Sequence, residues 1–160
     1  MNHVSCPTSV IKAPVDIVWA LLMHPEAWGE FYDIRVLAVD PAGPATVGQR
    51  IIAESGPRVF HFKLELRFTR IDALNREMGL SVRLPLGIRV EENLVCVPLG
   101  DDQCRVSYNC DFRFPQGWRG TLARLILRRE LETGPADSLN RLRRAAEDRF
   151  AGHGTPESPR

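Results

Sequence analysis

Two spacings of apolar residues divide the chain into a part predicted to form strands and a part predicted to form a helix. Between Ile34 and Phe114 apolar and polar residues alternate, which is the period of a β-strand with one buried face. Between Gly117 and Phe150 apolar residues recur at steps of three and four, which is the period of an α-helix. Such a helix needs an apolar surface to lie on, so we expect it to lie across the sheet.

The alternation is clearest from Phe60 to Phe68, where five apolar positions face one way and four polar positions face the other. Met78–Leu84 and Cys104–Phe114 repeat the pattern, and six strands are predicted in this part of the chain. Short connections rich in Gly, Pro and Asp join the strands, so neighbouring strands are expected to be antiparallel.

The N-terminal part adds one strand and two short helices to this arrangement. Val4–Ile11 is predicted to be a strand, short and polar enough to lie at an edge of the sheet. Pro14 suits the first turn of a helix predicted over Val15–Leu22, and Glu26–Phe31 is predicted to form a second, shorter helix. The fold class is therefore α+β, with a seven-stranded antiparallel sheet and one long C-terminal helix.

Composition and charge exclude several classes of protein. A chain of 160 residues with 44% hydrophobic residues suits one globular domain, expected over residues 1–150 and followed by a loose tail over 151–160. No run of about 18 apolar residues is present, so no membrane span is expected, and without a signal-like start we expect a cytoplasmic location. A formal net charge of +1 argues against nucleic acid as a partner.

No sequence motif indicates a metal or an organic cofactor. Cys6, Cys96, Cys104 and Cys110 form no C-x-x-C pair and have no histidine at zinc-like spacing, so we expect no metal and reduced thiols. The glycine-rich motifs that bind nucleotides and the G-x-S-x-G motif of serine hydrolases do not occur. We therefore expect no cofactor.

One N-terminal motif resembles a known superfamily. The run from Val10 to Leu22, with Ala13-Pro14 and Val18-Trp19 inside it, and the later Pro25-Glu26-Ala27-Trp28 resemble the START-like, or SRPBCC, superfamily. The polyketide cyclase/dehydrase and lipid-transport branch is the most similar, and the likeness covers about residues 4–150. It implies a helix-grip fold, in which the sheet wraps around the long helix. It also implies a cavity between them for a hydrophobic or aromatic small molecule, in carriers and in enzymes.

The long helix is expected to bend. Two groups of apolar residues centre on directions roughly 100° apart, Trp118, Leu122, Leu125 and Ile126 in the first half and Leu139, Leu142, Ala146 and Phe150 in the second. Gly134-Pro135 lies between the two groups, and a proline removes a helical hydrogen bond, so we predict a kink or short break there. The second half is expected to fill the grip of the sheet, and the first half to form a movable wall at the cavity mouth.

The candidate ligand-binding residues come from three parts of the chain. The inward faces of the strands contribute apolar side chains, the second short helix contributes aromatic side chains to the rim or to a hydrophobic plug, and the long helix contributes its first half. They are Phe60, Phe62, Leu64, Leu80, Val82, Val90 and Phe112 from strands, Trp28, Phe31 and Tyr32 from the short helix, and Leu122 and Ile126 from the long helix.

Two polar residues among these inward positions are the candidate catalytic groups. Glu92 shares the phase of Val90 and Leu94, and a carboxyl group in an apolar pocket has a raised pKa and can act as an acid or a base. Alternatively, a bulge over residues 91–93 returns Glu92 to water. The Tyr108 hydroxyl can orient a ligand carbonyl or donate a proton, or it can bond to a backbone group as buried tyrosines commonly do.

Three functions remain open at this stage. The first is a carrier or binding protein for a hydrophobic small molecule, aromatic, polyketide-like or lipid-like. The second is an enzyme of the polyketide cyclase/dehydrase type that works without a cofactor through Glu92 and Tyr108. The third is a protein-interaction module that uses the sheet surface or the long helix, on which Leu127 and Leu131 are either an exposed contact or covered by loops. The oligomeric state stays open between a monomer and a weak dimer.

Overall fold

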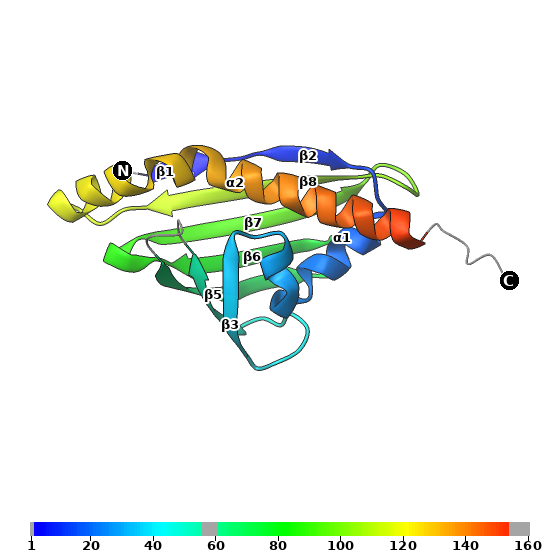
Figure 1. Ribbon diagram of the computed structural model, residues 1–160, viewed down its shortest axis with the longest axis horizontal. Helices are drawn as coiled ribbons and strands as arrows, with labels where there is room; N and C mark the ends of the chain where they lie inside the picture. The colour runs from blue at the N-terminus through cyan, green and yellow to red at the C-terminus, as the bar shows by residue number, and fades with distance from the viewer. Residues whose placement is uncertain (1, 56–60, 154–160) are drawn as a thin grey trace, which may run out of the picture.

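The protein is an antiparallel sheet with a long helix lying across one face (Figure 1). The computed structural model describes residues 2–55 and 61–153, with the backbone alone for residues 2, 126–132 and 153. The elements are β1 (Asn2–Ser5), β2 (Thr8–Ile11), α1 (Val15–Leu22), η1 (Pro25–Glu30), β3 (Ile34–Asp40), β4 (Arg50–Ser55), β5 (Phe62–Asp72), β6 (Glu77–Arg83), η2 (Pro85–Gly87), β7 (Arg89–Pro98), β8 (Cys104–Arg113) and α2 (Trp118–His153).

The predicted α+β helix-grip architecture is confirmed. The described sheet has eight strands in the order β1-β8-β7-β6-β5-β4-β3, with β2 also paired to β8. Every pairing is antiparallel, and β3 to β8 follow one another as neighbours, as the short connections predicted. No helix among the described residues is long and apolar enough to cross a membrane.

The strand count is the first correction. The predicted first strand is two strands, because the chain breaks at Cys6-Pro7. Ser5 pairs with Cys110 and Thr8 pairs with Ser107, so both pieces keep one register along β8. Pro7 has no N–H to donate to the ladder, although its carbonyl still accepts a hydrogen bond of 2.9 Å from the Tyr108 amide. The predicted edge position is correct, since β1 and β2 pair only with β8 in the described sheet.

A bulge in β3 is the second correction, because it interrupts the alternation of buried and exposed residues in that strand. The pairing of β3 with β4 shifts register between Val36 and Ala38. Ala38, which alternation places inward, is exposed, and Val39 is half-buried instead. One extra residue in a strand exchanges the faces of all the residues after it, and alternation in a single strand does not reveal that insertion.

One end of the inner face of the sheet is a closed core. The helices α1 and η1 cover it, and Trp28 of η1 packs edge-on against Phe68 with their ring centroids 5.5 Å apart. The Trp28 indole donates a hydrogen bond of 3.1 Å to the Leu22 carbonyl, which satisfies its polar atom inside the core. The largest fully buried side chains of this region include Phe31, Phe68, Met78, Leu80 and Leu94.

The long helix α2 is bent but not broken. It runs without interruption from Trp118 to His153 with Pro135 inside it, so the short break that the sequence allowed does not occur. In Figure 1 its axis changes direction between the yellow and the orange part. Pro135 is buried, and packing of the helix on the sheet offsets the loss of the backbone hydrogen bond that proline cannot donate.

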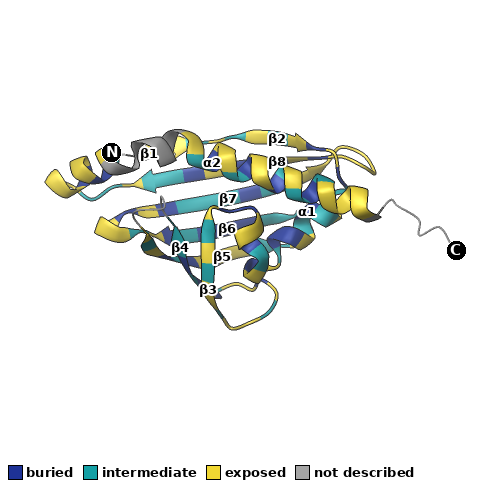
Figure 2. Ribbon diagram, viewed as in Figure 1, coloured by how far each residue is buried: buried dark blue, intermediate teal, exposed yellow. Residues whose placement is uncertain are grey.

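The two halves of α2 differ in burial. Leu139 and Leu142 are at most 3% exposed and Ala146 is fully buried, so the prediction that the second half fills the grip is correct. Trp118 and Leu125 in the first half are 71% and 73% exposed (Figure 2). These side chains face solvent and do not form the predicted wall of a cavity.

Candidate functional site

A cavity of about 440 Å³ lies between the sheet and α2, beyond the closed core. Its apolar wall comes from inward positions on four neighbouring strands, where alternation placed them: Phe62, Leu64, Val82, Val90 and Phe112. Its opposite wall is the middle of α2, where Thr133, Gly134, Pro135 and Ser138 present small or polar side chains. Because no large apolar side chain projects from this part of the helix, the space stays open.

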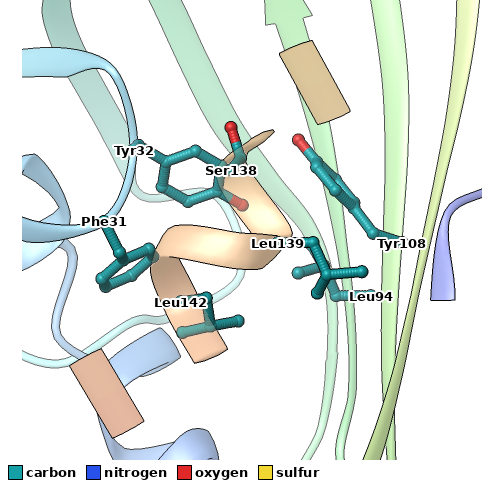
Figure 3. A pocket seen from close by; sticks show the side chains of 7 residues that line it. All are labelled: Phe31, Tyr32, Leu94, Tyr108, Ser138, Leu139 and Leu142. Atoms are coloured by element: carbon teal, nitrogen blue, oxygen red, sulfur yellow. The ribbon is translucent and has the colours of Figure 1, made fainter. Parts of the chain in front are cut away.

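The floor of the cavity is closed by the residues in Figure 3. Tyr32, Tyr108 and Ser138 line the cavity and also a narrow crevice beneath it, which has no room for a water molecule. Tyr32 and Tyr108 lie on either side of the α2 turn that carries Ser138 and Leu139. Their rings meet edge-on, with centroids 6.3 Å apart and an interplanar angle of 72°. The two tyrosines therefore mark the boundary between core and cavity.

Glu92 points into the cavity. On β7 it pairs with Leu80 on one side and Cys110 on the other, and neither pairing shifts register, so the bulge that would expose it is absent. Its Oε2 atom is buried and has no hydrogen-bond partner among the described residues. Burial raises the pKa of Glu92 to about 7, an interaction with the Tyr108 hydroxyl lowers it in part, and the charge of Glu91 adds to the rise.

The groups around Glu92 keep their protons at neutral pH. Burial raises the pKa of Tyr108 well above the ordinary value, and the charge of Glu92 raises it further. Burial also raises the pKa of Tyr32, as does the charge of Glu92, while an interaction with the Tyr108 hydroxyl lowers it. Burial raises the pKa of the Cys110 thiol in the same way. The site thus combines one carboxyl group that titrates near neutrality with two phenol donors.

The structure brings together most of the residues that the sequence singled out, but not all. Trp28 is fully buried in the core and so fits the plug rather than the rim, and Leu80 is fully buried beneath the closed end. Phe31 lies in the crevice below the cavity. Leu122 is 40% exposed and is absent from the cavity wall, because its side of α2 faces away from the sheet.

Four predicted positions fall on residues or side chains outside the described part of the chain. Phe60 lies outside the described residues, as do the side chains of Ile126, Leu127 and Leu131.

The rim of the cavity contains polar residues that the sequence interpretation missed. Arg141 of α2 and Asp33, just before β3, form an ion pair of 3.2 Å across the mouth, and Asp137 lies beside it. The Ser55 hydroxyl donates a hydrogen bond of 2.8 Å to the Asp33 carbonyl and holds this loop against β4. The only signal in the sequence was Gly134-Pro135, which marks the stretch of helix that faces the opening.

No group of three or more His, Cys, Asp or Glu side chains in the described part of the chain is arranged to hold a metal ion. The polar groups that line the cavity are instead carboxyls, phenols, hydroxyls, a thiol and a guanidinium, a set suited to hydrogen bonds with a small organic molecule.

Comparison with known proteins finds one matching family and several solved structures of similar fold. The profile of the family described as polyketide cyclase/dehydrase and lipid transport matches residues 5–147. The Zhui aromatase/cyclase of Streptomyces sp. R1128 superposes with a TM-score of 0.77 at 18% identity, over 98% of this chain and 100% of that one. A norcoclaurine synthase point mutant of Thalictrum flavum, in complex with a transition-state analogue, gives 0.67 at 17% identity, over 97% and 98%. No curated protein matches the sequence.

Proposed function

The chain belongs to the polyketide cyclase/dehydrase and lipid transport family, and from this premise we propose that it binds a hydrophobic small molecule between the sheet and α2. The ligand is of an aromatic, polyketide-like or lipid-like kind. The observation that carries the proposal is the cavity of about 440 Å³ with an apolar wall and a polar floor. Small-molecule sites commonly occupy about 300–1,000 Å³ and combine apolar walls with a few placed polar groups.

The polar floor indicates which hydrogen-bonding groups the ligand carries. The buried Oε2 of Glu92 lacks a partner, and an unpaired buried polar atom costs about 1–3 kcal/mol. A ligand hydroxyl placed there would satisfy Oε2, and the Tyr108 hydroxyl would donate to a neighbouring ligand carbonyl. A polyphenol or a polyketide carries both groups on an otherwise apolar body.

A thermal-shift and native mass spectrometry screen against polyphenols, quinones and lipids tests the binding. The expected result is a stoichiometric complex with at least one of these classes and a raised Tm. Val90→Phe, which fills the cavity, should abolish the shift, whereas Val97→Phe, on the same strand but facing outward at 37% exposure, should keep it. Loss of binding in both variants, or in neither, would place the ligand elsewhere.

A second candidate function is catalysis of an aldol-type cyclisation, favoured by the pKa of about 7 at Glu92. In the carboxylate form Glu92 would remove a proton from a methylene carbon between two carbonyls of the bound chain. The resulting carbanion would attack a further carbonyl carbon, forming a C–C bond, and Tyr108 would donate its proton to the new alkoxide. Return of the proton from Glu92 to Tyr108 would restore both residues.

Cyclisation of a poly-β-carbonyl substrate by Glu92→Gln and Tyr108→Phe variants tests these roles. Each variant should lose 10²- to 10⁴-fold in kcat, the usual contribution of general acid–base catalysis. The parent rate should rise with pH through about 7 as Glu92 loses its proton. Glu91→Gln, on the outer face beside it, is the control: it should keep kcat, although the pH midpoint should fall slightly because the charge of Glu91 adds to the rise in the pKa of Glu92. Full activity in both cavity variants would leave binding as the function and reject the catalytic assignment.

A further inference from the structure

The first turns of α2 carry an apolar ridge that faces solvent. Trp118, Leu122 and Leu125 are 71%, 40% and 73% exposed, and their spacing of four and three residues puts them on one side of the helix. Figure 2 shows this end of the helix as mostly exposed. A single exposed leucine is ordinary, but three large apolar side chains in line indicate a contact surface.

The ridge is turned away from the protein rather than poorly packed. Taking about 100° per residue, the three ridge residues lie within roughly 60° of one another, and Ala123 lies on the opposite side. Ala123 is fully buried, so a small residue faces the protein and the large ones face outward. This inverts the usual orientation of an amphipathic helix on a globular protein.

Arginines flank the ridge on both sides. Arg119 lies on one flank with its guanidinium 5.6 Å from the centre of the Trp118 ring, and Arg124 lies on the other flank, over Phe114 at 4.8 Å. From Arg113 to Arg129 the sequence contains five arginines and no acidic residue. The segment is strongly basic although the whole chain has a formal net charge of only +1.

We infer that the first part of α2, from Trp118 to Leu125, docks on a lipid bilayer that contains anionic headgroups, with Trp118, Leu122 and Leu125 inserted into the interface. Tryptophan and leucine on one side of a helix with arginines along its flanks is the composition of helices that lie in that interface. Each arginine near such a surface is worth about 1 kcal/mol. A second copy of the chain is a poorer occupant, because pairing of two such helices brings like charges together.

Docking would bring the cavity close to the bilayer. Thr133, where the cavity wall begins, lies eight residues beyond Leu125 on the same helix, about 12 Å along its axis. A hydrophobic ligand could then pass between membrane and cavity over a short distance. This consequence rests on the proposed binding function, whereas the docking itself does not.

Co-sedimentation of the full chain with vesicles of phosphatidylcholine alone, or of phosphatidylcholine and phosphatidylglycerol at about seven to three, tests the inference. We expect binding to the anionic vesicles, little binding to the neutral ones, and a loss as salt increases. Tryptophan emission should shift to shorter wavelength on binding, since Trp118 moves from water into the interface while Trp28 is already buried.

Leu125→Glu and Leu74→Glu form a matched pair of variants. Leu74, in the turn between β5 and β6, is 92% exposed and carries the same side chain away from α2. Leu125→Glu should lower the vesicle partition coefficient at least about tenfold, and Leu74→Glu should leave it within about twofold. Arg119→Gln should lower it about fivefold, the factor that corresponds to one arginine. Circular dichroism should show both glutamate variants folded.

Three results would overturn the inference. The first is equal binding to neutral and anionic vesicles, and the second is equal losses in Leu74→Glu and Leu125→Glu. The third is a dimer in sedimentation that Leu125→Glu dissociates. The ligand screen is independent of these measurements. A protein that binds vesicles but no ligand would reject the proposed function and keep the docking surface.

Discussion

The inner face of the sheet has a closed end and an open end, although the same strands build both. On β6, Leu80 is fully buried in the core, while Val82, two residues further, faces the cavity. On β7 the same change occurs between Leu94 and Glu92. The strands alternate equally well at both ends, so alternation decides only which face a residue takes. The elements opposite the sheet decide whether that face is filled.

The covering elements explain the difference between the two ends. Over the closed end lie Trp28 of η1, Phe31 just after it, and the side chains of Leu139 and Leu142 on α2. Over the open end α2 presents Gly134, Pro135 and Ser138. The volume of the side chains on the covering elements therefore decides whether the inner face is a filled core or an open binding site.

Truncation should cost much more at the closed end. Phe68→Ala removes a ring that is 1% exposed and packs on Trp28, and we expect a loss of about 3–5 kcal/mol in the free energy of unfolding. Phe112→Ala removes a ring that already borders open space, so the loss should be about 1 kcal/mol. Urea denaturation at neutral pH measures both, and equal losses would contradict the distinction between the two ends.

Removing the buried charge at the open end should stabilise the protein at alkaline pH. The pKa of Glu92 is raised from 4.5 to about 7, so its contribution to stability is present below pH 4.5 and is lost as pH rises through 7. That shift corresponds to about 3 kcal/mol. Glu92→Gln should therefore be up to about 3 kcal/mol more stable than the parent at pH 8, with little difference near pH 4.5.

The control for this prediction is Glu91→Gln. Glu91 faces outward on the same strand and accepts a hydrogen bond of 3.1 Å from Ser81, so its substitution should not remove the pH dependence. Urea midpoints measured between pH 5 and 8 compare the three proteins. A parent whose stability stays constant across this range would show that Glu92 is well solvated.

Adding a ring should distinguish filled from empty space on a single strand. Leu80→Phe overpacks the closed end, with an expected cost of about 1–3 kcal/mol. Val82→Phe projects into the cavity, so the cost should be below about 1 kcal/mol and ligand binding should be lost. Thermal unfolding with and without ligand measures both effects. A severe loss of stability in Val82→Phe would mean that the open end is as tightly packed as the core.

The smallest effect is expected at the rim. Asp33 and Arg141 are both substantially exposed, so Asp33→Asn should change stability by at most about 1 kcal/mol. The ion pair nevertheless spans the mouth, and its loss should speed ligand release. Stopped-flow measurement of ligand dissociation would detect this, and Asp40→Asn, which breaks an exposed pair with Arg50, should leave the rate unchanged.

Much of the fold could be predicted because its signals are local. The strand runs, the two short helices and the long helix appear in the spacing of apolar residues, and all are present. The errors in the predicted strands occur where a single residue interrupts the regular alternation or the strand pairing. Pro7 divides the first strand without a change of register, and the bulge at Val36 and Ala38 moves Ala38 outward.

The site could be predicted less completely. Alternation pointed Glu92 and Tyr108 inward, and both line the cavity. Alternation also pointed Leu80 inward, but that residue is covered by the core, and Leu122 of the long helix lies outside the cavity. No pattern indicated that Asp33 and Arg141, 108 positions apart in the chain, meet at the mouth.

By itself, the sequence determined which face most strand residues take, the part of β3 after its bulge excepted, because side-chain direction follows from the backbone geometry of a strand. Only the tertiary structure decided where the inner face is empty, since that depends on which distant residues of η1 and α2 lie opposite each strand. The pKa of Glu92 has the same origin: surroundings from several elements remove water from its carboxyl group, and no local pattern contains them.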